Sequence, residues 1–168
     1  MTATLYLGID PGASGGLCLL NANGIIIDVL PIPDTEHDVG EYLREFHQQI
    51  HYAAIEFVQA FPGQGVSSSF NFGRNYGFWR GLLVAYRIPF HEVTPRKWQQ
   101  IVGVPALPKR KEKRGTTAKK NITKAAAQRL WPSVKFTHAT ADAALIAEYA
   151  RRVYARFLAR TEIEGVLA

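Results

Sequence analysis

Residues 5–16 read LYLGIDPGASGG, and this stretch decides how the rest of the chain is interpreted. A short apolar run ends in one carboxylate, Asp10, and a glycine-rich turn follows at once. This pattern is typical of a buried strand that presents an acid to something bound beyond the edge of a sheet. The remaining question is which other side chains lie beside Asp10.

Two further strands are expected directly after the glycine turn. Residues 16–20 are apolar, residues 21–24 read NANG, and residues 25–30 are rich in β-branched side chains. Asn and Gly tolerate a positive φ, so they favour a tight hairpin between the two apolar runs. Together with a first strand over residues 4–9, this pattern predicts three consecutive antiparallel strands.

The middle of the chain supplies a second acid. An amphipathic helix is expected over residues 38–50, and the apolar run at 52–57 predicts a strand with Glu56 at its end. Residues 61–69 are expected to form a flexible loop. The aromatic spacing over residues 72–86 predicts a buried helix, and glycines four residues apart on it would let another element approach closely.

An edge strand and three helices are expected in the C-terminal half. Residues 87–93 contain a proline, which favours a strand at the edge of a sheet. Residues 94–103 begin with Thr-Pro and end with glycine, which predicts a short helix. A basic segment at 105–120 leads into a helix over 122–130, and a long alanine-rich helix with one apolar face is expected over 137–157.

The composition fits one globular domain, with 47% hydrophobic residues in a chain of 168. The formal net charge of +6, with clustered Lys and Arg, favours a polyanionic partner. The single cysteine, Cys18, excludes an intramolecular disulfide and a multi-cysteine zinc site, and we expect it in the core. Because neither a signal-peptide pattern nor a membrane-length apolar run is present, we expect a soluble cytoplasmic protein.

Acids at the ends of regular elements point to metal-dependent hydrolysis. Asp10 and Glu56 end strands and Asp142 opens the last helix, so three carboxylates would meet if the strands are neighbours. Hydrolysis of a phosphodiester near neutral pH needs such a cluster, because carboxylate oxygens hold two Mg²⁺ ions that activate water and stabilise the leaving oxygen. His138, four residues before Asp142, would face the same way as a fourth ligand or a general base.

Each of these residues also has a simpler interpretation. An acid at a strand end often belongs to a solvated turn, and Asp142 can favour the positive end of its helix. His138 can be a surface imidazole. Three acids that each stand at the end or start of a regular element are less easily explained as coincidence.

The basic segment is interpreted as a contact zone for a phosphate backbone, with a solvated surface as the alternative. Its cations are Lys109, Arg110, Lys111, Lys113, Arg114, Lys119 and Lys120. Phe57 and Phe61 lie beside the second acid and its loop, where they are candidates for stacking on unpaired bases. Core packing explains these two phenylalanines equally well.

Five motifs, taken in order, carry a resemblance to a known family. They are Gly8-Ile9-Asp10-Pro11-Gly12, Ala54-Ile55-Glu56, Thr94-Pro95 with Lys97, the lysines Lys119, Lys120 and Lys124, and Ala141-Asp142-Ala143. In this order they resemble the RuvC family of Holliday-junction resolvases, particularly its phage-type relatives, over nearly the whole chain. The first motif alone would not be specific, since actin-like ATPases and sugar kinases of the same ribonuclease H-like superfamily begin similarly.

The resemblance implies an α/β fold in a single domain over residues 1–168. Its centre would be a ribonuclease H-like mixed five-stranded sheet, with the first three strands antiparallel and helices on its faces. The resemblance also implies a homodimer in a bacterial or phage-infected cell. This dimer would nick two symmetric strands of a four-way DNA junction with Mg²⁺ or Mn²⁺, two ions in each active site.

Residue by residue, Asp10, Glu56 and Asp142 match the acidic ligands of the family. The classical bacterial pattern has an acid or histidine three residues before the last Asp, where this chain has Ala139. His138 stands four before, which resembles the looser spacing of phage relatives, and is kept as the fourth site residue. Lys119 or Lys120 would come near the scissile phosphate and offset its charge.

The sequence is therefore interpreted as that of a metal-dependent, structure-specific DNA endonuclease that resolves four-way junctions. Three alternatives stay open. The first is an actin-like ATPase or kinase, which is disfavoured because those proteins pair two such domains. The second is a non-catalytic protein of the same fold that binds branched DNA. The third is a related nuclease that acts on forks, flaps or RNA–DNA hybrids.

Overall fold

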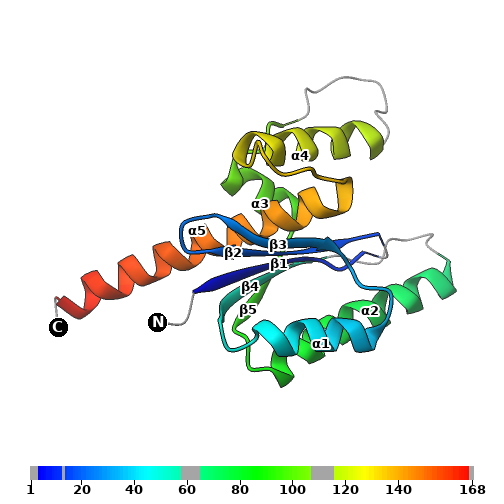
Figure 1. The fold of residues 1–168 in the computed structure, drawn as a ribbon, viewed down its shortest axis with the longest axis horizontal. Helices are drawn as coiled ribbons and strands as arrows, with labels where there is room; N and C mark the ends of the chain where they lie inside the picture. Colours follow the sequence, from blue (N-terminus) through cyan, green and yellow to red (C-terminus); the bar gives the residue numbers. More distant parts are fainter. Residues whose placement is uncertain (1–3, 13, 58–64, 107–115, 167–168) are drawn as a thin grey trace.

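The structure is a computed structural model that describes residues 4–12, 14–57, 65–106 and 116–166, with the backbone alone for 116–120 and 159–166. A five-stranded mixed sheet forms its centre (Figure 1). The strands are β1 (Leu5–Asp10), β2 (Gly16–Asn21), β3 (Ile26–Pro31), β4 (Ile50–Glu56) and β5 (Phe90–Val93), in the spatial order β3-β2-β1-β4-β5. The first three strands are antiparallel, and β4 and β5 run parallel to β1, which confirms the expected sheet.

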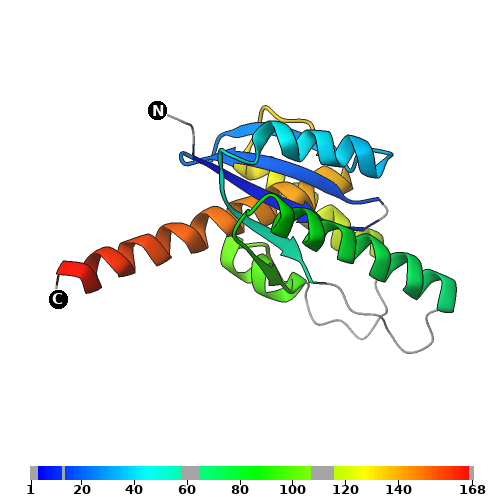
Figure 2. The ribbon, with the colours of Figure 1, turned by 90° about the horizontal axis from the view of Figure 1, so that it is seen from below.

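Helices cover both faces of this sheet (Figures 1 and 2). One face carries α1 (Glu36–Phe46) and α2 (Val66–Ala85), and the other carries α3 (Pro95–Val102), α4 (Thr116–Leu130) and α5 (His138–Val166). Successive strand residues point to opposite faces, so β1 contributes to two cores. Leu7 and Ile9 pack with Trp79 of α2, whereas Tyr6 packs on the side of α5.

The N-terminal half of α5 lies directly on the strand backbones. A Cβ on Gly8 would be 2.2 Å from the backbone N of Ala147 and 2.3 Å from the carbonyl O of Ala143. A Cβ on Gly16 would likewise be 2.8 Å from the carbonyl O of Ala139. Glycine in the strands and alanine in the helix therefore permit this close approach. The C-terminal half of α5 projects beyond the sheet (Figure 2).

Some expected boundaries were wrong. The first helix ends at Phe46 and not at residue 50, because Ile50 is buried as the first residue of β4. The expected loop over 61–69 overlaps α2, which begins at Val66 although serines fill its first turn. Phe157, expected on the apolar face of the last helix, is 58% exposed, since α5 has left the sheet by that point.

One face of α2 is open along its length. A Cβ built at Gly73, Gly77 or Gly81 meets no atom within 4 Å, so the expected close neighbour is absent among the described residues. On the same helix Val66 and Phe70 are 87% and 69% exposed. One side of α2, made of glycines and exposed apolar side chains, is therefore not covered by any other described element of the chain.

Two further expectations concern the single cysteine and membrane-spanning segments. Cys18 is fully buried as a free thiol, which confirms its place in the core. Within the described ranges, none of the helices has the length and apolar character needed to cross a membrane.

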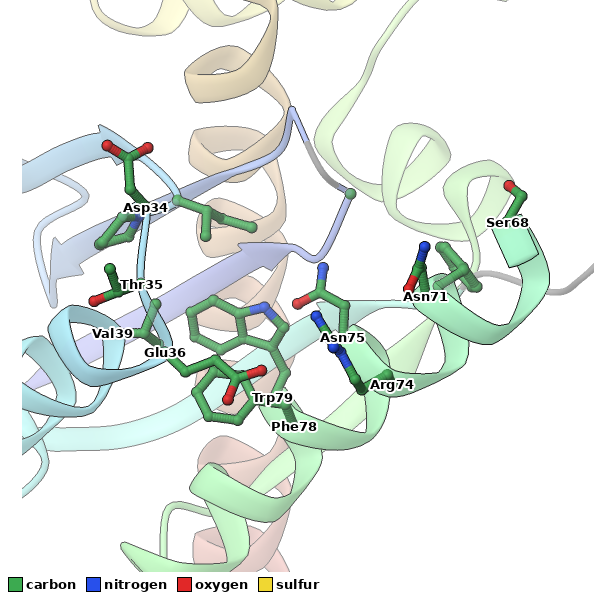
Figure 3. A pocket seen from close by; sticks show the side chains of 14 residues that line it. Asp34, Thr35, Glu36, Val39, Ser68, Asn71, Arg74, Asn75, Phe78 and Trp79 are labelled. Carbon is green, nitrogen blue, oxygen red and sulfur yellow. The ribbon is translucent and has the colours of Figure 1, made fainter.

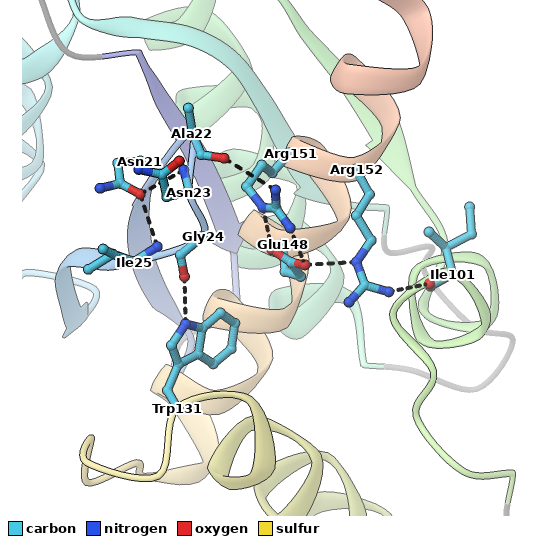
Figure 4. Close-up of polar contacts among 10 residues, drawn as sticks. All are labelled: Asn21, Ala22, Asn23, Gly24, Ile25, Ile101, Trp131, Glu148, Arg151 and Arg152. Carbon is cyan, nitrogen blue, oxygen red and sulfur yellow. Dashed lines mark hydrogen bonds and ion pairs between the residues drawn. The ribbon is translucent and has the colours of Figure 1, made fainter. Parts of the chain in front are cut away.

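A buried ion-pair cluster ties α5 to two other elements (Figure 4). Glu148 accepts hydrogen bonds of 2.7 Å from the guanidinium groups of Arg151 and Arg152. Arg151 also donates to the carbonyl O of Ala22 in the β2–β3 turn, and Arg152 to that of Ile101 in α3. Burial alone would raise the pKa of Glu148, but the two guanidinium groups lower it overall. Glu148 thereby fixes the hairpin and α3 on α5.

Replacing Glu148 with alanine is expected to lower the free energy of unfolding by ~3–5 kcal/mol, because two partly buried guanidinium groups lose their carboxylate. Urea unfolding at pH 7 measures this loss. The lowered pKa stabilises the fold above the unfolded pKa of the carboxyl, and this contribution is lost as the pH falls through the folded pKa. The free energies of unfolding of the parent and of Glu148→Ala should therefore become equal at acidic pH. Glu41→Ala, which removes an exposed pair with Arg44, is the control, and an equal loss there would contradict the argument.

Candidate active site

Asp10 and Glu56 lie side by side at one end of the sheet. Ile9 pairs with Ile55 in the parallel register of β1 and β4, so the next residue of each strand occupies neighbouring positions. Adjacent strands are only about 4.8 Å apart. Strand alternation puts Asp10 on the face of Gly8, the face that α5 covers. Two carboxylates from separate segments therefore meet under the start of α5.

The third acid, Asp142, arrives on α5. It directly precedes Ala143, whose carbonyl lies against Gly8, and its Oδ1 is buried. The electrostatics link all three acids. The pKa of Glu56 is raised from 4.5 to about 8. Burial is the largest cause, the charges of Asp10 and Asp142 also raise the pKa, and a hydrogen bond from Trp98 lowers it. Each acid is thus within electrostatic range of Glu56.

The three carboxylates do not form a ready coordination shell. In the part of the chain that the structure describes, no group of three or more His, Cys, Asp or Glu side chains is positioned to hold a metal ion. Asp10 Oδ1 accepts a hydrogen bond from the backbone N–H of Gly12 at 3.1 Å, and Glu56 Oε2 accepts one from Trp98 Nε1 at 2.7 Å. The donor set nevertheless suits Mg²⁺, because carboxylate oxygens are the hard ligands that this ion prefers.

Trp98 was not expected at the site. The sequence pattern assigned it to the apolar side of the helix after Thr94-Pro95, and the residue is indeed buried, with 1% exposure. Its indole N–H, however, reaches a carboxylate 42 positions earlier in the chain. The only signal in the sequence was the position of Trp98, one turn into the helix that follows β5, the neighbour of the strand that ends at Glu56.

His138 faces α4. It is the first residue of α5, where Thr137 and Thr140 cap the helix through reciprocal backbone-to-hydroxyl hydrogen bonds. The Nε2 atom of His138 lies 3.1 Å from Oδ1 of Asn121. The groups that shift the pKa of Glu56 do not include His138. Its role as a fourth ligand or general base stays a prediction.

The nucleic-acid contacts expected from the sequence are only partly described. Lys109, Arg110, Lys111, Lys113, Arg114 and Phe61 lie outside the described residues. Lys119 and Lys120 belong to the first turns of α4, where only the backbone is described. Phe57 follows Glu56 and therefore points to the opposite face, where its ring meets Tyr76 edge-on at 6.3 Å between centroids. Packing against α2 thus accounts for Phe57 in the free chain.

A separate hollow of about 690 Å³ lies on the α1–α2 face (Figure 3). Asp34 and Glu36 border it from the start of α1, and Arg74 and Asn75 border it from α2. The side-chain amide of Asn75 donates to the carbonyl O of Pro11, which ties α2 to the glycine turn after Asp10. Asn75 therefore holds the turn from the α2 side of the sheet, and the residues that line the hollow include none of the three acids.

The sheet order, the strand directions and the helix laid on β1 define a ribonuclease H-like fold of the RuvC type. The structure is similar to that of RuvC from Thermus thermophilus in complex with Holliday junction substrate, with a TM-score of 0.66 and 16% identity over 92% of this chain and 96% of that chain. A second structure of Thermus thermophilus RuvC gives a TM-score of 0.61, with 16% identity and the same coverage. No protein-family model matches the sequence, and no curated protein matches it either.

Proposed function

We propose that the chain is a metal-dependent endonuclease that resolves four-way DNA junctions. The observation that supports this most is the convergence of Asp10, Glu56 and Asp142 at one end of the sheet, where burial, together with the charges of Asp10 and Asp142, raises the pKa of Glu56 to about 8. The fold is that of RuvC, a protein that has been solved with a Holliday junction substrate. The net charge of +6 suits a DNA ligand.

In the proposed reaction, Asp10, Glu56 and Asp142 hold Mg²⁺ or Mn²⁺, with His138 as a candidate fourth ligand. Two such ions supply an activated water and stabilise the leaving oxygen when bound. The protein's own contribution is to hold the carboxylates in place. The backbone N–H of Gly12 fixes Asp10, Trp98 fixes Glu56, and the close contact between Gly8 and α5 fixes Asp142 above them.

The same proposal assigns the DNA contacts. Lys109, Arg110, Lys111, Lys113, Arg114, Lys119 and Lys120 would bind phosphates along the junction arms. Lys119 or Lys120 would approach the scissile phosphate. Phe57 and Phe61 would stack on unpaired bases, which for Phe57 requires its ring to leave Tyr76.

A homodimer is part of the proposal, because two symmetric cuts need two active sites and a twofold junction suits a twofold dimer. The open face of α2 supports this. It combines the exposed side chains of Val66, Phe70 and Val84 with glycines that have no neighbour within 4 Å among the described residues. Apolar surface of this kind on a helix is typical of a protein contact.

The test is incubation with synthetic four-way, forked, duplex and RNA–DNA hybrid substrates in Mg²⁺, Mn²⁺ or EDTA. We expect paired, symmetric nicks in the four-way junction that require the metal. Preferential cutting of forks, flaps or hybrids would instead support a related nuclease of the same fold, and ATP turnover would support the kinase-like alternative.

Asp10→Asn is expected to reduce cleavage at least ~100-fold while junction binding persists, because it removes a charged ligand from the metal site but leaves the DNA contacts. Gel-shift binding in Ca²⁺ and cleavage in Mg²⁺ measure the two effects separately. Asp34→Asn, at the α1–α2 hollow, is the matched control and should cut normally. Joint loss of binding and folding in Asp10→Asn would mark the residue as structural.

A non-catalytic protein that binds branched DNA is the second candidate. The orientation of His138 toward Asn121 and the absence of a ready coordination shell among the described residues favour it. Tight binding of the junction without cleavage in either Mg²⁺ or Mn²⁺ is the outcome that would select this alternative.

A further inference from the structure

We propose that Trp98 is a positioning residue, whose indole N–H orients the Glu56 carboxylate for the metal ion of the proposed endonuclease site. This inference rests on the proposed function. The contact itself is a 2.7 Å hydrogen bond from Trp98 Nε1 to Glu56 Oε2, made by an indole that is 1% exposed. An indole N–H donates and cannot accept, so it cannot compete for the metal.

The topology explains how the indole reaches the acid. Glu56 ends β4, the neighbouring strand β5 ends at Val93, and α3 starts two residues later. Trp98 is the fourth residue of α3 and packs in the same core as Ala54 and the alanines of α5. The helix is held there by the hydrogen bond from Arg152 to the carbonyl of Ile101 (Figure 4). The element that carries Asp142 therefore also holds the helix that aims Trp98.

The other two tryptophans show that burial alone does not require this contact. The chain has three tryptophans. Trp79 is 0% exposed on the opposite face of the sheet, yet its Nε1 has no hydrogen-bond partner among the described residues. Trp131 donates to the backbone carbonyl of Gly24. Only Trp98 pairs with a side chain of the acid cluster, where the bond is charge-assisted once Glu56 is ionised.

The consequence for the site is geometric. A buried carboxylate beside Asp10 and Asp142 is repelled by both, and without a fixed donor it can rotate away from them. The indole fixes Oε2 and leaves Oε1 available for a cation.

Trp98→Phe tests the inference, because it keeps an aromatic ring in the core and removes the N–H. Trp79→Phe is the matched control, since it removes an N–H on the far face of the sheet for which the described part of the chain offers no hydrogen-bond acceptor. Calorimetric titration with Mn²⁺ in the absence of DNA should give about 10- to 100-fold weaker binding for Trp98→Phe and unchanged binding for Trp79→Phe. Cleavage by Trp98→Phe should recover as Mn²⁺ is raised, while its junction binding in Ca²⁺ stays that of the parent.

The outcomes separate this inference from the proposed function. If the parent protein binds Mn²⁺ and cuts the junction but Trp98→Phe binds Mn²⁺ equally well, Trp98 is a packing residue only and the inference is overturned. If cleavage by Trp98→Phe falls and excess Mn²⁺ does not restore it, the inference is also overturned. If the parent protein neither binds Mn²⁺ nor cuts any substrate, the proposed function itself has failed, and the inference fails with it.

Discussion

Gly8→Ala is expected to be the most destabilising single-methyl substitution in the sheet. The new Cβ would lie 2.2 Å from the N of Ala147, 2.3 Å from the O of Ala143 and 2.7 Å from the Cα of Ala147. All three are backbone atoms, so no side chain can rotate away, and α5 must lift from β1. We expect a loss of ~3 kcal/mol or more in the free energy of unfolding, at or beyond the upper end of overpacking effects.

Thermal unfolding measures this effect, and the midpoint should fall by ~6–12 °C for a domain of this size. Because α5 carries Asp142, any folded fraction should also lose metal-dependent cleavage. Gly40→Ala is the control: it lies inside α1, and a Cβ there meets no atom within 4 Å. It should stabilise the protein by ~0.5–1 kcal/mol, since alanine restricts the unfolded chain. Equal effects of the two substitutions would contradict the close packing of α5 on β1.

Gly8 also shows what the sequence could and could not predict. The three antiparallel strands were predictable, because Asn21 to Gly24 favour a hairpin and the flanking runs are apolar. The meeting of Asp10 with Glu56 followed once the two strands were taken as neighbours, and β1 and β4 are indeed parallel neighbours in the sheet. The contact of Gly8 with α5 was not predictable, because a glycine within an apolar run carries no sign of which distant helix covers it.

The contacts that were missed depend on single atoms. The spacing of Trp98 on its helix correctly predicted burial, but hydrophobic periodicity does not report where one indole N–H points. The start of α2 was missed because serines favour turns and Gly65 provides no side-chain cap, so tertiary packing and not local propensity decides that boundary. Periodicity thus predicts which face is buried, whereas the partner of each polar atom emerges only from the assembled fold.

Glu56→Gln is expected to abolish metal-dependent cleavage and at the same time to stabilise the metal-free protein at alkaline pH. The pKa of Glu56 is raised from 4.5 to about 8, first by burial and then by the charge of Asp10. The folded state therefore keeps a proton that the unfolded state has released. This stabilising contribution is complete below the unfolded pKa and is lost as the pH rises through about 8. Glutamine stays neutral throughout and can still accept from Trp98.

The gain of Glu56→Gln in the free energy of unfolding should reach ~2–4 kcal/mol at pH 9 in EDTA and vanish near pH 4. Thermal unfolding of the parent and of Glu56→Gln across this pH range measures it. Glu41→Gln is the control, because this exposed carboxyl has a pKa lowered by Arg44 and should give no gain at alkaline pH. Mg²⁺ should then raise the unfolding temperature of the parent more than that of Glu56→Gln, since an ion bound by the folded state stabilises it. A gain that is independent of pH would mean that the pKa of Glu56 is not raised by its buried position beside Asp10 and Asp142, and the charge cluster that supports the endonuclease proposal would be lost with it.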